Sequence, residues 1–222
     1  MILTDNETIT IRKMIHEIRN PLTAASCTLQ LIQSKYPELE NEKLFKSLSG
    51  DLNYMTALLS NFSDFVSNRQ PQLNTFLLGD LIKEVALSFA IQCAEETFSF
   101  SSKIDLEGVS FTGDSVQLQQ LLRNLLKNAA QACEANDYIY LHTYVQDHYV
   151  VISIKDTGCG ISEDQLPTIF DPFVTYTQKH GSGIGLPICK QIVEAHHGTI
   201  KVTSVLGEGT TFRILLPQTP CK

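Results

Sequence analysis

The chain of 222 residues contains no tryptophan, and it lacks a run of apolar residues long enough to cross a membrane, which takes about 18 residues. It also lacks an excess of basic residues, because 17 Lys and Arg stand against 24 Asp and Glu, for a formal net charge of -7. A nucleic-acid-binding protein usually shows a basic patch, so this balance argues against that class. The N-terminal residues are polar and of mixed charge, unlike a secretory signal. We therefore expect this segment to lie in the cytoplasm.

Cysteine patterns typical of zinc sites and of disulfide frameworks are missing as well. The six cysteines stand at positions 27, 93, 133, 159, 189 and 221. They form no Cys-x-x-Cys pair and have no histidine at zinc-ligand spacing. Hydrophobic residues make up 43% of the chain, enough for an ordinary core. We expect reduced thiols rather than disulfides.

Apolar residues recur at intervals of three or four residues in two series within the first 70 residues. The series are Ile11, Ile15, Ile18, Leu22, Ala25, Leu29 and Ile32, then Leu44, Leu48, Leu52, Met55, Leu59, Phe62 and Val66. This spacing predicts two helices, interrupted at Tyr36-Pro37 because proline breaks a helix. One helical hairpin cannot cover its own apolar seam. The pattern therefore predicts a dimeric four-helix bundle, that is, a homodimer through residues 1–70.

The pattern changes after Gln70-Pro71-Gln72, which we interpret as a linker. Beyond it we predict strands over 98–104, 109–112, 138–145, 149–155, 200–205 and 211–216, and helices over 78–96, 116–133 and 186–196. Consecutive hairpins mixed with helices favour an α+β sandwich, in which helices cover one face of a mixed sheet. The expected organisation is an all-α hairpin over residues 1–70, followed by an α+β domain over residues 71–222.

His16 lies beside the apolar seam, in the string His16-Glu17-Ile18-Arg19-Asn20-Pro21-Leu22. Because it is not a seam residue, we expect its ring to face solvent, where a neutral imidazole is a competent nucleophile. Glu17 could orient the ring by holding one of its protons. Asn20 shares the helix face of His16, and Pro21 should bend the helix one turn later. A lone surface histidine is usually only a solvated side chain. The interpretation of His16 as a nucleophile therefore depends on the residues around it.

An apolar helical segment carries Asn124 and Asn128, four residues apart, so that both carboxamides face the same way. Carboxamide oxygens suit Mg²⁺, and Arg123 and Lys127 would supply positive charge for phosphates. The alternative is that both asparagines are ordinary polar residues on the protein surface. We do not favour this alternative, because amides buried in so apolar a helix need hydrogen-bond partners.

Three glycine-rich segments follow. The string Asp156-Thr157-Gly158-Cys159-Gly160-Ile161 ends a predicted strand, so the carboxylate could accept a hydrogen bond from an amine such as that of adenine. The string Gly181-Ser182-Gly183-Ile184-Gly185-Leu186 opens a helix, whose free N–H groups suit phosphate. It fails the dinucleotide fingerprint, because its sixth residue is leucine and no strand precedes it. Each string alone could be only a turn.

Two further segments complete this set. Residues 173–180 are polar and could form a lid over a nucleotide, with Phe170 and Phe173 at its base. The string Gly207-Glu208-Gly209-Thr210-Thr211-Phe212 lies between the last two predicted strands and is at least a hairpin turn.

The string around His16 resembles the H-box of sensor histidine kinases. The downstream strings resemble, in order and spacing, the N, G1, F, G2 and G3 boxes of the Bergerat-type ATP-binding domain that these kinases share with gyrase, heat-shock chaperones and MutL. The resemblance covers residues 9–217. It implies that His16 is the phosphoacceptor, that Glu17 assists proton removal, and that Asn20 supports removal of phosphate from a partner regulator.

For the nucleotide, the resemblance implies that Asn128 binds Mg²⁺ and that Asp156, reinforced by Thr210, binds the adenine of ATP. The remaining expected nucleotide contacts are Asn124, Lys127, Gly158, Gly160, Ile161, Phe173, Gly181, Gly183, Gly185 and Leu186. In the ATPase branches the position of Asn124 carries a glutamate that activates water. An amide cannot accept that proton, so the γ-phosphoryl group is left for His16.

The sequence departs from the family pattern at Gln131-Ala132, where many members carry a lysine and an aromatic residue. This difference puts some phosphate contacts in doubt. The string His196-His197-Gly198 could suggest a metal site, but in the family it closes a helix. We favour that structural role.

The resemblance predicts an ATP- and Mg²⁺-dependent kinase core that phosphorylates His16 and passes the phosphoryl group to an Asp of a response-regulator receiver domain. It also predicts that protein inhibitors dock on the helical bundle. Two alternatives stay open: a phosphotransfer-only dimer with an inactive nucleotide domain, and a conformational ATPase. A serine-directed kinase of the same superfamily would lack the H-box.

Among subfamilies, the strings look most like sporulation kinases of Bacillus-type bacteria. Only 15 residues precede His16, so we expect the sensor domain in a longer parent protein, which could be membrane-anchored.

Overall fold

The computed structural model describes residues 5–67, 70–176 and 183–218. The chain divides into two compact units, Met1–Arg69 and Gln70–Lys222. Among the described residues, no helix has the length and apolar character needed to cross a bilayer.

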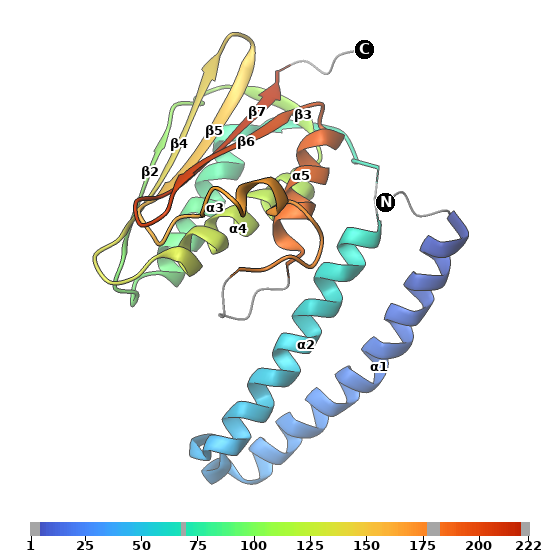
Figure 1. Ribbon diagram of the computed structural model, residues 1–222. Coiled ribbons are helices and arrows are strands. Elements are labelled where there is room, and N and C mark those ends of the chain that lie inside the picture. Colours follow the sequence, from blue (N-terminus) through green and yellow to red (C-terminus); the bar gives the residue numbers. More distant parts are fainter. Residues whose placement is uncertain (1–4, 68–69, 177–182, 219–222) are drawn as a thin grey trace. The chain divides into compact units, whose positions relative to one another are not determined.

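The first unit is a helical hairpin (Figure 1). Helix α1 (Asp5–Lys35) and helix α2 (Lys43–Ser67) are joined by a short 3₁₀ helix, η1 (Pro37–Asn41). The predicted break at Tyr36-Pro37 is confirmed, because Pro37 opens η1 and the preceding helix ends at Lys35. Helix α1 continues through Pro21, and the hydroxyl of Thr23 donates to the carbonyl of Arg19 at 2.9 Å. The bend expected at Pro21 stays a prediction.

Within the hairpin, the two predicted apolar series are only partly covered. Ile15 and Val66 are buried, with 4% and 3% of their surfaces exposed. By contrast, Ile18, Leu48 and Leu44 are 51%, 50% and 84% exposed. A single hairpin thus leaves much of the apolar seam open, which is the condition that favours pairing with a second copy.

The second unit contains one larger and one smaller sheet. Its elements are β1 (Asn74–Leu77), α3 (Leu78–Gln92), β2 (Ser99–Ile104), β3 (Ser110–Gly113), α4 (Ser115–Ala132), β4 (Tyr138–Gln146), β5 (Tyr149–Asp156), η2 (Leu166–Thr168), α5 (Gly185–Ala195), β6 (Thr199–Val205) and β7 (Gly209–Pro217). The larger sheet has the order β2-β4-β5-β7-β6, with β2 and β4 parallel and the other neighbours antiparallel. Helices α3, α4 and α5 cover one of its faces (Figure 1), so the predicted α+β sandwich is confirmed.

The smaller sheet was not predicted. Strand β3 pairs with β1 in antiparallel register, as Phe76 with Phe111, instead of joining the larger sheet. Helix α3 also ends at Gln92, four residues before the predicted end, because the chain turns through Cys93 and Ala94.

The core of the second unit lies between the helices and the sheet. Helix α4 places Leu121, Leu122, Leu125 and Leu126 inside, each at most 1% exposed. The alternating pattern of β4 and β5 buries Ile139, Leu141, Ile152 and Ile154 against them. The two-residue turn Asp147-His148 between these strands has positive φ at both residues, as a type I′ hairpin requires. This packing fixes the end of β5, where the first glycine-rich segment begins.

Candidate functional site

Asp156, the last residue of β5, is a buried carboxylate with only 2% of its surface exposed. Its Oδ1 accepts the backbone N–H groups of Gly158 at 3.1 Å and Thr210 at 3.2 Å. Burial raises the pKa of Asp156, and these two N–H donors partly oppose that rise. Both bonds end on Oδ1, so Oδ2 can accept a hydrogen bond from a ligand's N–H group.

Thr210 is tied to the same loop through Ser204 of β6. The Ser204 hydroxyl lies 2.8 Å from Oγ1 of Thr210, donates to the carbonyl of Gly209 at 2.9 Å, and accepts the N–H of Ile161 at 2.8 Å. Sequence reasoning missed Ser204. The signal was available, because Ser204 occupies an inward-facing position of the alternating pattern of β6, where an apolar residue is expected.

Three glycines let the surrounding backbone segments approach Asp156 closely. A Cβ added at Gly158 would lie 2.3 Å from the carbonyl oxygen of Ala132, and one at Gly160 would lie 2.1 Å from that of Val205. A Cβ at Gly209 would lie 2.1 Å from the carbonyl oxygen of Asp156 itself. Any side chain at these positions would push the loops apart. The first and third glycine strings therefore pack closely against their neighbours, and each gives one backbone N–H to the carboxylate of Asp156.

Helix α4 carries both predicted asparagines. Asn124 and Asn128 are half-buried, while Arg123 and Lys127 are exposed on the same helix. The Nδ2 of Asn124 lies 3.5 Å from the carbonyl of Gly185, the first residue of α5. The helix that carries the amides therefore contacts the start of the helix that follows the second glycine segment.

The second glycine segment is described only from Gly183 onward. Gly183 has φ +64°, and its carbonyl accepts the N–H of Phe173 at 2.9 Å. Helix α5 begins at Gly185 without a side-chain cap, so its first N–H groups are available to an anion. Leu186 is half-buried and Phe173 is 61% exposed. Gly181 and the lid residues 177–180 lie outside the described residues.

His196 has a structural role, as predicted for the string that it begins. It is 5% exposed and caps the C-terminal end of α5. Its Nδ1 lies 2.8 Å from the carbonyl of Ile192, and its Nε2 accepts the N–H of Asp114 at 2.9 Å. Burial lowers the pKa of His196, which fits a neutral ring that donates at Nδ1 and accepts at Nε2. In the described part of the chain, no group of three or more His, Cys, Asp or Glu could hold a metal ion.

Asp114 connects this histidine with helix α4 and the linker. Its Oδ1 caps α4 by accepting the N–H groups of Val116 at 3.0 Å and Gln117 at 3.1 Å. Its Oδ2 accepts the N–H of Gln72 at 2.9 Å. The linker and α4 therefore meet at the carboxylate of Asp114, and α5 meets its backbone N–H through His196. Sequence reasoning did not single out this residue.

The cysteines of the described residues are all unpaired, as expected. Burial raises the pKa of the Cys133 thiol to about 12 and raises that of Cys189 as well, so both stay protonated. Cys159 is exposed between the glycines of the first segment.

His16, Glu17 and Asn20 lie in the first unit. All three side chains are exposed on α1, while Ile15 beside them is buried. The expectation that the ring of His16 faces solvent off the apolar seam is confirmed.

Two family models match the chain. Residues 9–71 match the His Kinase A (phospho-acceptor) domain, and residues 113–220 match the histidine kinase-, DNA gyrase B-, and HSP90-like ATPase family. The solved catalytic domain of histidine kinase ThkA is 31% identical, with a TM-score of 0.59, and the match covers 67% of this chain and 97% of that domain. This chain belongs to the sensor histidine kinases. The predicted family and the class of protein-histidine kinase are confirmed.

Other histidine kinases resemble the chain over most of its length. It is 32% identical to the signal transduction histidine-protein kinase AtoS of Escherichia coli over 92% of this chain and 34% of AtoS. It is 33% identical to sporulation kinase A of Bacillus subtilis, over 91% of this chain and 33% of that kinase. The full-length ShkA structure in complex with AMPPNP has the same fold, with a TM-score of 0.80 at 23% identity, and the match covers 99% of this chain and 47% of ShkA. The chain thus spans about a third of the length of the two curated kinases.

The order of the two matched domains agrees with a histidine kinase core. The phosphoacceptor match contains His16, and the ATPase match contains Asn124, Asn128, Asp156 and Thr210. The alternatives of a conformational ATPase and a phosphotransfer-only dimer are not favoured by this pairing.

Proposed function

We propose that this core binds Mg-ATP in the second unit and transfers the γ-phosphoryl group to His16. The observation that carries the proposal is the environment of Asp156, whose Oδ1 is held by two backbone N–H groups while Oδ2 remains for a ligand. An exocyclic amine of adenine is an N–H donor of the kind that Oδ2 could accept. Thr210 and Ile161, held by Ser204, fix the loops around that contact.

The phosphate end of the nucleotide would lie toward α4 and α5. The free N–H groups at the start of α5, with Gly181, Gly183, Gly185 and Leu186, would hold the phosphates. Lys127 would add positive charge, and Phe173 would anchor the lid. Asn124 and Asn128 have the hard amide oxygens that Mg²⁺ accepts alongside phosphate oxygens. Bound Mg²⁺ neutralises phosphate charge during transfer.

In the phosphoryl transfer, one ring nitrogen of His16 forms a bond to the γ-phosphorus as the bond to the β–γ bridging oxygen breaks. ADP leaves with the electron pair of that bond. Glu17 takes the proton from the other ring nitrogen. Asn124, which cannot act as a base, does not promote attack by water. Catalysis then rests mainly on positioning and charge neutralisation.

Downstream, we propose that phosphorylated His16 passes its phosphoryl group to an aspartate of a response-regulator receiver domain, and that Asn20 supports the separate phosphatase reaction, in which water attacks the aspartyl phosphate and inorganic phosphate leaves. Support comes from the crystal structure of histidine kinase ThkA in complex with response regulator TrrA. In that structure ThkA is 26% identical to this chain, with a TM-score of 0.67, over 95% of this chain and 61% of ThkA.

We assign dimerisation and phosphotransfer to residues 1–70 and ATP binding to residues 71–222. The exposed seam of the hairpin supports the homodimer, and protein inhibitors would dock on the same bundle. The unpaired cysteines support placing this segment in the cytoplasm.

The experiment is incubation with γ-labelled ATP, comparing the wild type with His16→Ala and with His148→Asn as a matched histidine control. His148 is exposed at the β4–β5 turn, where asparagine tolerates its positive φ. We expect acid-labile, base-stable label on the wild type and the control, and none on His16→Ala. Label that persists on His16→Ala refutes the proposal.

Two further readouts separate the alternatives. Release of free phosphate without labelled protein would indicate a conformational ATPase. Titration calorimetry that detects no Mg-dependent ATP binding would indicate a phosphotransfer-only dimer.

A further inference from the structure

Helices α3, α4 and α5 leave one face of the five-stranded sheet uncovered (Figure 1). This face carries basic side chains in register. One row crosses all five strands through directly paired positions: Lys103, His142, Ser153, Arg213 and Lys201. Lys155 stands in the adjoining row, paired with Tyr140 and Thr211. We call these residues, with the tyrosines of β4, the outer face.

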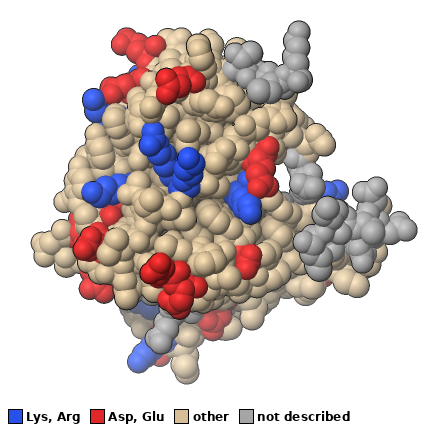
Figure 2. Space-filling view, turned by 45° about the horizontal axis from the view of Figure 1, so that its top comes forward, with Lys and Arg blue, Asp and Glu red and all other residues tan. Residues whose placement is uncertain are grey.

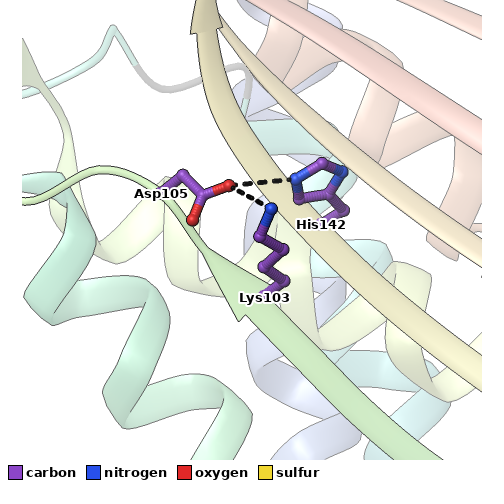
Figure 3. Close-up of polar contacts among 3 residues, drawn as sticks. All are labelled: Lys103, Asp105 and His142. Carbon is purple, nitrogen blue, oxygen red and sulfur yellow. Dashed lines mark hydrogen bonds and ion pairs between the residues drawn. The ribbon is translucent and has the colours of Figure 1, made fainter.

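The charge of the outer face is opposite to that of the unit that carries it. Acidic residues outnumber basic ones in residues 70–222. Asp105 is the acid beside this row, and it contacts Lys103 Nζ at 3.0 Å and His142 Nε2 at 3.3 Å (Figure 3). In the part of the chain that the structure describes, Lys155, Lys201 and Arg213 form no ion pair. Figure 2 shows several Lys and Arg side chains gathered in the middle of the visible face of the molecule. Lys155 and Lys201 are exposed and, among the described residues, have no carboxylate partner, whereas Arg213 donates to Tyr144 and to Gln146 Oε1, at 2.8 Å for the latter.

Aromatic rings fill the outer face along β4. Tyr138, Tyr140, His142 and Tyr144 follow one another with centroid distances of 6.3, 5.8 and 4.8 Å. The hydroxyl of Tyr144 accepts from Arg213 Nη2 at 3.1 Å, so the guanidinium group reaches from β7 across β5. Because Tyr140 and His142 each have an aromatic neighbour on both sides, the faces of these two rings are not free to stack on nucleobases. Tyrosine and arginine at the centre of a flat surface are instead typical of protein–protein interfaces.

We propose that the outer face binds a carboxylate-rich helix of another protein, lying across the strands. Neighbouring strands are about 4.8 Å apart and successive turns of a helix about 5.4 Å apart, so one carboxylate per turn would meet successive positions of the basic row. The tyrosines would cover the apolar part of that helix. This interaction surface is separate from the carboxylate of Asp156, because Asp156 lies on the buried face of β5, toward the helices, and the outer face is the opposite one.

The test uses the complete chain and a fluorescent alanine-based helical peptide of about 17 residues with one glutamate per turn on one face. Binding is measured by fluorescence anisotropy at low salt. The charge-reversal pair Lys155→Glu with Lys201→Glu removes two exposed cations of the outer face. The matched control, Lys46→Glu with Lys83→Glu, makes the same change in net charge at exposed positions on α2 and α3.

We expect saturable binding to the wild type that weakens at least about tenfold in the outer-face pair and less than about twofold in the control pair. Circular dichroism and retained Mg-ATP binding show that each variant is folded. The proposal is overturned if the wild type does not bind the peptide, or if both pairs weaken it equally. It is also overturned if single-stranded DNA or phosphatidylglycerol vesicles bind more tightly than the peptide through the same lysines, because the occupant would then belong to another class of polyanion.

Discussion

The Oδ1 of Asp156 accepts the backbone N–H of Thr210 at 3.2 Å, although the two residues are 54 positions apart in the chain. This bond joins the end of β5 to the beginning of β7 and places the carboxylate between two glycine-rich loops.

Asp156→Asn should weaken ATP binding at least about tenfold, because a hydrogen bond to a charged group contributes about 1.5–3 kcal/mol. The variant keeps an acceptor at the position of Oδ1 and so keeps the loops in place. Titration calorimetry with Mg-ATP measures the loss. Unchanged affinity would show that Asp156 does not contact the nucleotide.

The same variant should change the pH dependence of stability. Burial raises the pKa of Asp156 above its unfolded value, so its favourable contribution is full below the unfolded pKa and is lost as pH rises through the folded pKa. At neutral pH the charged group costs stability, and Asp156→Asn should be at least as stable as the wild type. Urea unfolding at neutral and at acidic pH checks this. On acidification, the free energy of unfolding of the wild type should rise relative to that of the variant. A fall relative to the variant would contradict the argument that burial raises the pKa of Asp156.

Asn128→Ala should weaken binding of Mg-ATP about tenfold or more while leaving binding of metal-free ATP in excess chelator nearly unchanged, because the amide is proposed to hold the metal. Asn61→Ala, an asparagine on α2, serves as the control. Equal loss with and without Mg²⁺ would assign Asn128 to the nucleotide instead of the metal.

Two glycines of the β6–β7 turn should respond differently to alanine. At Gly207 (φ +81°) a Cβ meets nothing within 4 Å, so Gly207→Ala should cost only the left-handed backbone strain, about 1–2 kcal/mol. At Gly209 (φ +111°) the Cβ would also lie 2.1 Å from the carbonyl oxygen of Asp156, so a cost above about 3 kcal/mol is expected. Denaturant unfolding of both variants measures the difference. If both substitutions lower the free energy of unfolding equally, the β6–β7 turn can move away from Asp156 without loss of stability.

His196→Leu should destabilise the second unit by about 1–3 kcal/mol at neutral pH, because Asp114 N–H loses its acceptor in a buried position. Burial lowers the pKa of His196, so its favourable contribution is present above the unfolded pKa and is lost as pH falls through the folded pKa. The wild type should therefore lose stability between about pH 7 and 5 more steeply than the variant. The midpoints of urea unfolding, measured for both proteins across that pH range, give this loss of stability. The neighbouring, exposed His197→Asn is the control and should follow the wild type.

The sequence predicted helix α4 within one residue at each end, because its leucines repeat with helical spacing over 18 residues. The β4–β5 hairpin was equally clear from its alternation. Strand β3 was predicted within one residue at each end, although its pairing was not, and β1 was missed, since it has only four residues and no buried residue to create a pattern. The connections of Ser204 and of Asp114 with His196 are tertiary: Asp114 and His196 are 82 positions apart, and no local spacing encodes that contact.

The order of pairing in the larger sheet has a consequence for how the site forms. The β4–β5 and β6–β7 hairpins join segments that are adjacent in the chain, so each can close quickly on its own. The β5–β7 pairing joins these hairpins across the lid segment and α5, and it must meet the entropy cost of closing that long loop. Asp156 and Thr210 come together only through this long-range step. We therefore expect the binding loops to assemble after the two hairpins, so that ATP would stabilise a contact that forms late in folding.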